Sequence, residues 1–469
     1  MRHLIAILIH LVVLIPIAAA QPHTIDQTSM SGTTSYVPLV FGFGSTASNL
    51  PVSSATYLGG TANDSVSVVD VAQDSTILIG GTFPGYIASG VEPRVLIRDG
   101  AGAIIRLDQT GRVVRSIVRI GGTINDLEIS QSGNMIVCGD WGVALIDSTA
   151  SLVLWQDQNS AVSRCAIAGN DVAVALANGR LTVYTSGGTP LHTINVGGTA
   201  QTDVAIDGAS GTVIATGYTQ TSSDLQVAFM RGWASDGTLK WTSYGFSDAN
   251  VKAQNLLADT RGERVSIGRD RLLYFAGSIN GGTGASIFAR DPQNVASKLG
   301  SDRNIETDNY NRATNVGSVK MAWFGRYDPA SGALLQGSSL LTRRDDGRGN
   351  SISIKAITAD ERSRVYLAGD AAYQIQNRNT QQVAGVTVGP YALGEPYVAV
   401  LSADLQQRLV WTTFTGSTAA GGSPATAIGV RNAVAAIGVT RTAGSLITAN
   451  ALQPALGGGS DGYVAVWQP

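Results

Sequence analysis

The sequence predicts an all-β fold, a seven-bladed β-propeller whose first strand pairs with the last blade and closes the ring. Three observations support this fold class. Short apolar runs alternate with turn residues, and 56 of the 469 residues are glycine while only 14% are charged. A unit of four runs recurs along the chain, but the last unit stops after its third run, YVAVWQP (463–469). The stretch SATYLGG (54–60) resembles the missing fourth run, as in propellers that build one blade from both termini.

Each unit begins with an inner strand, a tight turn and a second apolar strand that ends in small residues. Several of these turns carry Gly, Asn or Asp, which hairpins favour. The seven predicted second strands are TILIGG (76–81), NMIVCGD (134–140), DVAVALA (171–177), TVIATGYT (212–219), LLYFAGS (272–278), RVYLAGD (364–370) and AVAAIGVT (433–440). In the fifth unit the inner strand is either ERVSIG (263–268) or AQNLLAD (253–259), and the blade count is the same with both.

A third and a fourth strand, joined by a polar turn, follow each second strand. The six complete pairs lie in residues 103–118, 142–157, 180–194, 228–244, 320–338 and 397–414. The seventh pair joins 463–469 with 54–60, which gives seven blades. Second strands lie as little as about 40 residues apart, the spacing typical of four-stranded blades. A six-bladed ring, an eight-bladed ring and a β-helix are the alternatives.

The first twenty residues have the pattern of an export signal. Arg2 precedes the apolar run LIAILIHLVVLIPIA (4–18), and Ala18 and Ala20 offer a small-x-small cleavage site. The alternative is an uncleaved anchor, although the run is shorter than the roughly 20 residues of a spanning helix. We therefore expect a signal peptide at 1–20, a flexible Ser/Thr/Gly-rich segment at 21–52 and the propeller at 53–469. The mature chain is then periplasmic, on the cell surface or extracellular, with no membrane span.

Charge and cysteine content narrow the expected partners. The formal net charge is −2 and no cluster of Lys and Arg is present, so nucleic acid is not an expected partner. Cys138 and Cys165 are the two cysteines. In an oxidising compartment they would form a disulfide between neighbouring blades, while their apolar strand surroundings suit two buried thiols equally well.

The closing segments resemble a known family. ANALQPALGGGSDGYVAVW (449–467) is similar to the SBBP (seven-bladed β-propeller) repeat of exported bacterial proteins, with its Leu-Gln-Pro, Gly-Gly-Gly-x-Asp and Tyr-Val-Ala elements. TYLGGTAND (56–64) resembles the closing strand of that repeat and the start of the next blade. The likeness covers blades 1, 6 and 7 and part of blade 4, whereas blades 2, 3 and 5 depart from it. It implies a propeller fold and an extracytoplasmic setting, and it implies no common catalytic residues.

Four long inserts interrupt the repeat, all between a second and a third strand. They run from Gly81 to Ala103, from Ser278 to Lys320, from Asp370 to Tyr397 and from Thr440 to Tyr463, in blades 1, 5, 6 and 7. Loops in this position emerge on one face of a propeller, so we expect that face to recognise a protein or a glycan. The alternative is that the inserts only cover the edges of the blades.

The insert in blade 5 contains candidate ligands for Ca²⁺. Asp302, Glu306 and Asp308 could place several oxygens around such an ion, but their spacing matches no calcium-loop template. A solvated surface loop is the alternative. We expect no other cofactor.

Catalysis by an imidazole is disfavoured by composition. Beyond the leader the chain has only His23 and His192, and nucleophilic triads and multi-His zinc sites need a suitably placed histidine. Carboxylate pairs are the alternative, because glycosidases need only two acids. Candidates on or beside inner strands are Asp70, Asp126, Asp203 and Asp207. The preferred function is an exported, non-enzymatic binding or scaffold protein, and the alternative is a carbohydrate-active hydrolase or lyase with carboxylates near the channel mouth.

Overall fold

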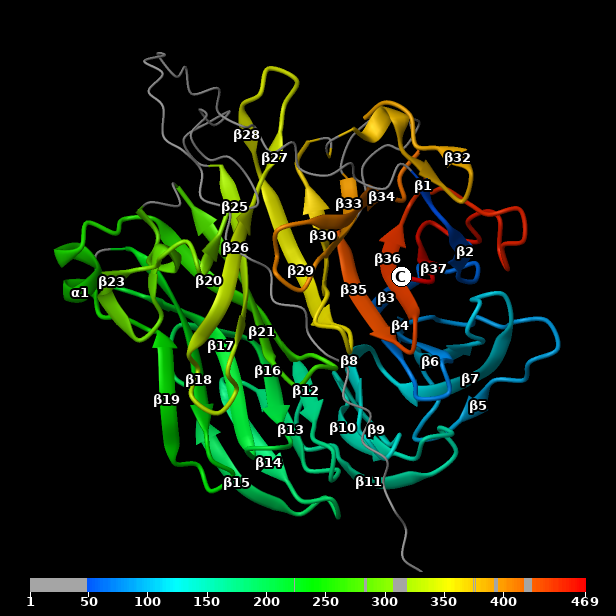
Figure 1. The fold of residues 1–469 in the computed structure, drawn as a ribbon. Helices are drawn as coiled ribbons and strands as arrows, with labels where there is room; N and C mark the ends of the chain where they lie inside the picture. The colour runs from blue at the N-terminus through cyan, green and yellow to red at the C-terminus, as the bar shows by residue number, and fades with distance from the viewer. Residues whose placement is uncertain are drawn as a thin grey trace, which may run out of the picture. The chain divides into compact units, whose positions relative to one another are not determined.

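The computed structural model describes residues 49–222, 224–281, 285–306, 319–373, 375, 377–391, 395–416 and 424–469. In these residues seven small β-sheets are arranged as a seven-bladed β-propeller, which confirms the predicted fold class (Figure 1). The predicted signal peptide, residues 21–48 of the predicted flexible segment and His23 lie outside the described residues. Residues 49–52 of that segment are described, with Asn49 and Leu50 in β1 and Val52 at the start of β2.

Each blade is a four-stranded antiparallel meander. The innermost strands are β3 (Ser65–Val71), β8 (Ile124–Ile129), β12 (Arg164–Ile167), β16 (Ala200–Asp207), β20 (Asp259–Ile267), β29 (Ile352–Ala359) and β35 (Ala425–Arg431). The second strands are β4 (Ile77–Thr82), β9 (Met135–Gly139), β13 (Ala173–Ala177), β17 (Thr212–Gln220), β21 (Leu273–Asn280), β30 (Val365–Ala371) and β36 (Val434–Arg441). The ambiguous inner strand of blade 5 is therefore the one that contains residues 263–267.

The outer half of each blade follows the predicted third and fourth runs. The third strands are β6 (Gly102–Leu107), β10 (Gly142–Ile146), β14 (Arg180–Tyr184), β18 (Gln226–Trp233), β25 (Lys320–Tyr327), β33 (Glu395–Leu401) and β37 (Asp461–Trp467). The outermost strands are β7 (Val114–Gly121), β11 (Val153–Asp157), β15 (Pro190–Asn195), β19 (Leu239–Tyr244), β26 (Leu334–Leu340), β34 (Arg408–Thr413) and β2 (Val52–Leu58).

The N-terminal strand completes the last blade, as the sequence predicts. β2 pairs antiparallel with β37, so that Thr56 lies opposite Val464 and Tyr57 opposite Tyr463. In Figure 1 the blue start of the described chain lies beside its red end. Each innermost strand also packs against that of the next blade, and β35 packs against β3, so the ring is closed.

A close approach of two backbones explains the glycines at the closure. A Cβ atom on Gly458 would lie 1.9 Å from the carbonyl oxygen of Ala62. Asp461 is fully buried there and accepts hydrogen bonds from the backbone of Gly457 and Gly458 and from Nε2 of Gln453. The Gly-Gly-Gly-x-Asp segment therefore fastens the two ends of the chain together.

The hydrophobic core is divided among the contacts between blades. In the described residues it forms seven clusters, and each combines side chains from two neighbouring blades. The second and third strands are covered on both faces by adjacent blades, so β9 and β10 are buried throughout. This two-sided burial explains why these strands read as continuous apolar runs rather than as an alternation.

Short elements occupy the inserts and connections. They are β1 (Asn49–Leu50), β5 (Arg94–Val95), β22 (Arg290–Asp291), β23 (Asn294–Lys298), β24 (Asn304–Ile305), β27 (Thr342–Arg343), β28 (Gly349–Asn350), β31 (Gln382–Val383), β32 (Val386–Thr387), α1 (Asp248–Ala253), η2 (Ile287–Ala289) and η3 (Arg378–Thr380). No helix among the described residues is long and apolar enough to cross a membrane. We call the face that carries the second-to-third-strand loops the loop face, and the opposite face the turn face.

Candidate functional site

Carboxylates on the innermost strands line the central channel and join neighbouring blades. Innermost strands of adjacent blades do not pair through their backbones, so their inward N–H groups need other partners. In four cases the partner of such an N–H group is a carboxylate of the preceding blade, which accepts its hydrogen bond. These are Asp70 to the N–H of Ile129 (3.3 Å), Asp126 to that of Cys165 (3.3 Å), Glu128 to that of Ile167 (3.0 Å) and Asp203 to that of Val265 (3.0 Å).

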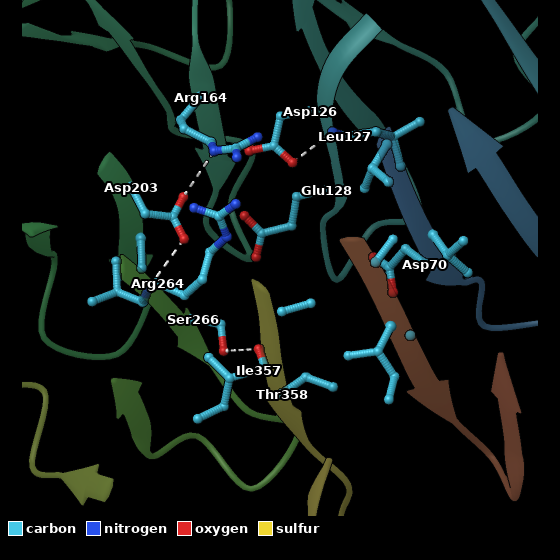
Figure 2. Close-up of a pocket in the computed structure, with 18 of the residues that line it drawn as sticks. Asp70, Asp126, Leu127, Glu128, Arg164, Asp203, Arg264, Ser266, Ile357 and Thr358 are labelled. Atoms are coloured by element: carbon cyan, nitrogen blue, oxygen red, sulfur yellow. Dashed lines mark hydrogen bonds and ion pairs between the residues drawn. The ribbon is translucent and has the colours of Figure 1, made fainter. Parts of the chain in front are cut away.

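Arginines from blades 3 and 5 lie among these acids (Figure 2). Nη2 of Arg269 lies 2.7 Å from Oδ1 of Asp70, across the ring from its own blade. Nε of Arg164 lies 3.6 Å from Oδ1 of Asp203. Nε of Arg264 donates to the backbone carbonyl of blade 6 at residue 355 (2.6 Å). The acids and arginines therefore form a charged layer that links blades 1 to 6 around the channel.

Burial dominates the electrostatics of this layer. It raises the pKa of Glu128 to about 8, although the hydrogen bond from Ile167 offsets part of the rise. It also raises the pKa of Asp126 to about 6, against the opposing charge of Arg164. The pKa of Asp203 is raised by burial too, while Arg264 and Arg164 oppose that change. At neutral pH Glu128 is thus largely protonated.

The channel is too small for a sugar ring between these groups. The pocket that the charged layer lines has a volume of about 160 Å³, below the range of roughly 300–1,000 Å³ found for ligand sites. Both its acids and its arginines already have partners in neighbouring blades. Their contacts therefore explain the presence of these acids and arginines in the channel, because they link one blade to the next.

The structure brings together three of the four carboxylates that the sequence predicts. Asp70, Asp126 and Asp203 line the same pocket, whereas Asp207 lies at the end of β16, where Ser210 donates to it from N (2.8 Å) and Oγ (2.5 Å). Sequence reasoning missed Glu128, which follows Asp126 by two residues. In a strand this spacing puts both side chains on one face, so the alternation along β8 would have revealed it.

A second pocket opens on the loop face between blades 4, 5 and 6. Its volume is about 380 Å³, and Lys355 lines both this pocket and the channel. We call it the loop-face pocket. Its charged lining residues are Asp259, Arg261, Glu263, Lys320, Lys355 and Asp370, and its neutral polar ones include Gln226, Ser278, Asn280, Ser351 and Ser353. Acceptors and donors therefore line one concave surface of a size that suits a small polar ligand.

Neighbouring residues hold several of these groups in place. Ser278 Oγ donates to Glu263 (2.8 Å), and Gln226 N donates to Asp259 (2.8 Å). The guanidinium of Arg261 stacks over the ring of Tyr218 at 4.9 Å. A polar surface fixed in this way loses little conformational entropy when a ligand binds.

The four inserts cover the outer edges of their own blades. In blade 1, β5 pairs parallel with β7, and in blade 5, β24 pairs parallel with β26. In blade 6, Gln381 Nε2 donates to the backbone carbonyl of Trp411 in β34 (2.8 Å). In blade 7, the N–H of Thr448 donates to the carbonyl of Ala55 in β2 (3.1 Å). Edge protection, which the sequence left as an alternative to recognition, is thus one function of the inserts.

Two of the three calcium candidates lie in the described part of the chain. Asp302 and Glu306 are exposed, and Asp308 lies outside the described residues. No group of three or more His, Cys, Asp or Glu that could hold a metal ion occurs among the described residues. His192 is exposed on the outermost strand of blade 3, away from the channel.

The two cysteines lie at the contact between blades 2 and 3. Cys138 is in β9 and Cys165 in β12, and the structure joins them as a disulfide with their Cα atoms 6.2 Å apart. Both are buried in the cluster that the two blades share.

Comparisons with known proteins give no family for this chain. No protein-family model matches it, and no curated protein matches it. The seven-bladed propeller is shown by the structure, whereas membership of the SBBP-repeat family stays a prediction from the closing motif.

Proposed function

We propose that the protein is an exported, non-enzymatic binding protein that recognises a glycan, or a glycan-bearing partner at a cell surface, through its loop face. The loop-face pocket carries this proposal. Carboxylates, amides and guanidinium groups that are already oriented are the partners that vicinal sugar hydroxyls require. The inserts of blades 5 and 6 stand next to this pocket, and loops on a rigid ring commonly supply recognition.

Export is part of the proposal and is supported by two features. The sequence begins with a pattern typical of a signal peptide, and the cysteines are paired in a disulfide, which is common in oxidising compartments. Fusion of residues 1–25 to a reporter that folds only after export would test this step. Retention of the reporter in the cytoplasm would contradict it.

A glycan array tests the ligand. We expect the purified mature chain to bind a subset of glycans, and Lys320→Ala to weaken that binding at least tenfold, because Lys320 lines the pocket. Lys298→Ala is the matched control, since Lys298 is an exposed lysine of the same insert that does not line the pocket. Absence of binding to every glycan on the array would contradict a glycan ligand. The remaining candidate ligand would then be a surface protein, which cross-linking on intact cells would detect.

One observation points to the alternative of a hydrolase or lyase, although the pocket of about 160 Å³ would have to widen to admit a sugar ring. Asp126, Glu128 and Asp203 share one pocket and all three have a raised pKa, as paired catalytic acids do. Incubation of array-positive glycans with the protein decides between the two. New reducing ends that disappear with Glu128→Gln would replace the binding proposal by the catalytic one.

A further inference from the structure

A wide funnel opens on the turn face, at the opposite end of the channel from the loop-face pocket. Its volume is about 790 Å³, and every blade contributes to its wall through the turn after its innermost strand. We call it the turn-face funnel. Asn432 Nδ2 donates to the carbonyl of Gln73 (2.8 Å), and Gln73 Nε2 donates to that of Gln131. These bonds tie the turns of blades 7, 1 and 2 to one another, so this part of the rim is preformed.

Arg431 is the unusual side chain of this funnel. It ends β35, lines the funnel and is only 8% exposed. Among the described residues its guanidinium makes no hydrogen bond and no ion pair within 4.0 Å. Burial and the neighbouring charge of Arg269 lower its pKa, and the charges of Asp70, Glu361 and Glu128 offset part of that change. Its nitrogens reach the water of the funnel, so an anion can bind there without displacing a protein partner.

The nearest acids are occupied or lie at the rim. Asp70 is bound to Arg269 at 2.7 Å, and Asp207 accepts hydrogen bonds from its own turn. Glu128 has a pKa of about 8, so it carries little negative charge at pH 7. Glu361 is exposed on the turn of blade 6. The funnel lining holds as many acids as arginines, but no acid among the described residues lies within ion-pair distance of Arg431.

A second arginine lines the same funnel. Arg271 is exposed, lines the same funnel and lies at the tip of the blade 5 turn, where its backbone has a φ of 66°. Guanidinium groups bind carboxylate and phosphate through two parallel hydrogen bonds, which an ammonium does not do. The volume of the funnel exceeds that of a bare anion and suits a ligand the size of a sugar.

We propose that the turn-face funnel binds the oxyanion group of a small ligand, a phosphate or a carboxylate, held by Arg431 at the base and Arg271 at the rim. This site is separate from the loop-face pocket, so it does not depend on the proposed function. The two sources of the oxyanion are a phosphorylated sugar and a sugar acid.

Calorimetric titration of the mature protein with glucose 6-phosphate and with glucuronate tests the site, with glucose as the neutral probe. We expect one of the two anions to bind and glucose not to bind. Arg431→Gln should weaken that binding at least tenfold, and Arg271→Gln should weaken it to a smaller extent. Binding of glucose 6-phosphate alone identifies a phosphate site, and binding of glucuronate alone a carboxylate site.

Two controls keep the test decisive. Arg362→Gln changes an exposed arginine on a turn of the same face that does not line the funnel, and it should leave the affinity unchanged. Arg431→Lys keeps the charge and loses the paired donors, so it should also weaken binding. Because circular dichroism reports whether the variants are folded, a folded Arg431→Gln protein with unchanged affinity would overturn the proposal, as would no binding of either anion to the unaltered protein.

Discussion

Glu128 shows how one side chain replaces the backbone pairing that neighbouring blades lack. Its Oε2 accepts the N–H of Ile167 in the next blade at 3.0 Å, and burial raises its pKa to about 8. The folded protein therefore holds a proton on this group at pH values where the unfolded chain has lost it. Asp126, on the same face of β8, makes the equivalent contact with Cys165.

We predict that Glu128→Gln changes the pH dependence of stability. Its raised pKa gives the unaltered protein a stability contribution that is present below about pH 4.5 and is lost as the pH rises through about 8. The loss amounts to roughly 1.4 kcal/mol for each pKa unit of the shift. Glutamine does not titrate. In urea denaturation, the free energy of unfolding of the variant should therefore rise relative to that of the unaltered protein between pH 5 and pH 9.

The control for this prediction is Glu92→Gln, which changes an exposed glutamate of the blade 1 insert. Its stability should run parallel to that of the unaltered protein at every pH. If the Glu128 variant also runs parallel, the carboxyl is not protonated in the fold.

At the scale of elements, the blade 6 insert is held to its blade by a buried ion pair. Nε of Arg378, at the start of η3, lies against Oε1 of Glu395, at the start of β33, and both side chains are 1% exposed. Arg378 Nη2 also donates to the carbonyl of Thr415 (2.9 Å), and Ile375 N donates to Glu395 (2.9 Å). These bonds fix the insert along the outer part of blade 6, next to β34.

Removing one member of this pair should lower the stability of the fold more than removing both. Arg378→Met leaves Glu395 buried without its cation, so we expect the free energy of unfolding to fall by about 3–5 kcal/mol. The double variant Arg378→Met/Glu395→Leu should recover much of that loss in urea denaturation. A single variant as stable as the unaltered protein would show that the pair does not hold the insert.

On the scale of the whole molecule, stability depends on closure of the ring. Each core cluster of the described residues lies between two blades, so opening one contact exposes the apolar sides of two sheets. β2 contributes to two such clusters through Tyr57 and Leu58, and Tyr57 packs edge-to-face on Tyr463 at 5.8 Å. The strand thus covers the outer edge of blade 7 and adds to its contacts with blades 6 and 1.

Deletion of residues 49–58 should therefore destabilise the entire propeller. We expect a loss of about 5 kcal/mol or more, since loss of one buried aromatic side chain alone costs about 3–5 kcal/mol. Thermal unfolding followed by circular dichroism measures the effect, and light scattering reports association through the exposed edge of β37. A chain that lacks only residues 1–48 is the control, and equal melting temperatures for the two chains would contradict the importance of closure.

The sequence by itself determined the architecture of this protein. The number of blades, the strand order, the closing pair of 54–60 with 463–469 and the position of the four inserts follow from local patterns, because each blade repeats the same alternation of apolar runs and turns. The candidate acids Asp70, Asp126 and Asp203 were also found, because inner strands face the channel in every blade.

Only the tertiary structure decided what those residues contact. The ion pair between Asp70 and Arg269 joins blades 1 and 5, and it leaves Arg431 without an ion pair among the described residues. The volumes of the channel, the loop-face pocket and the turn-face funnel depend on how seven blades pack around one axis. Contacts between residues about 200 positions apart leave no periodic trace in a sequence, because they arise from the closure of the ring.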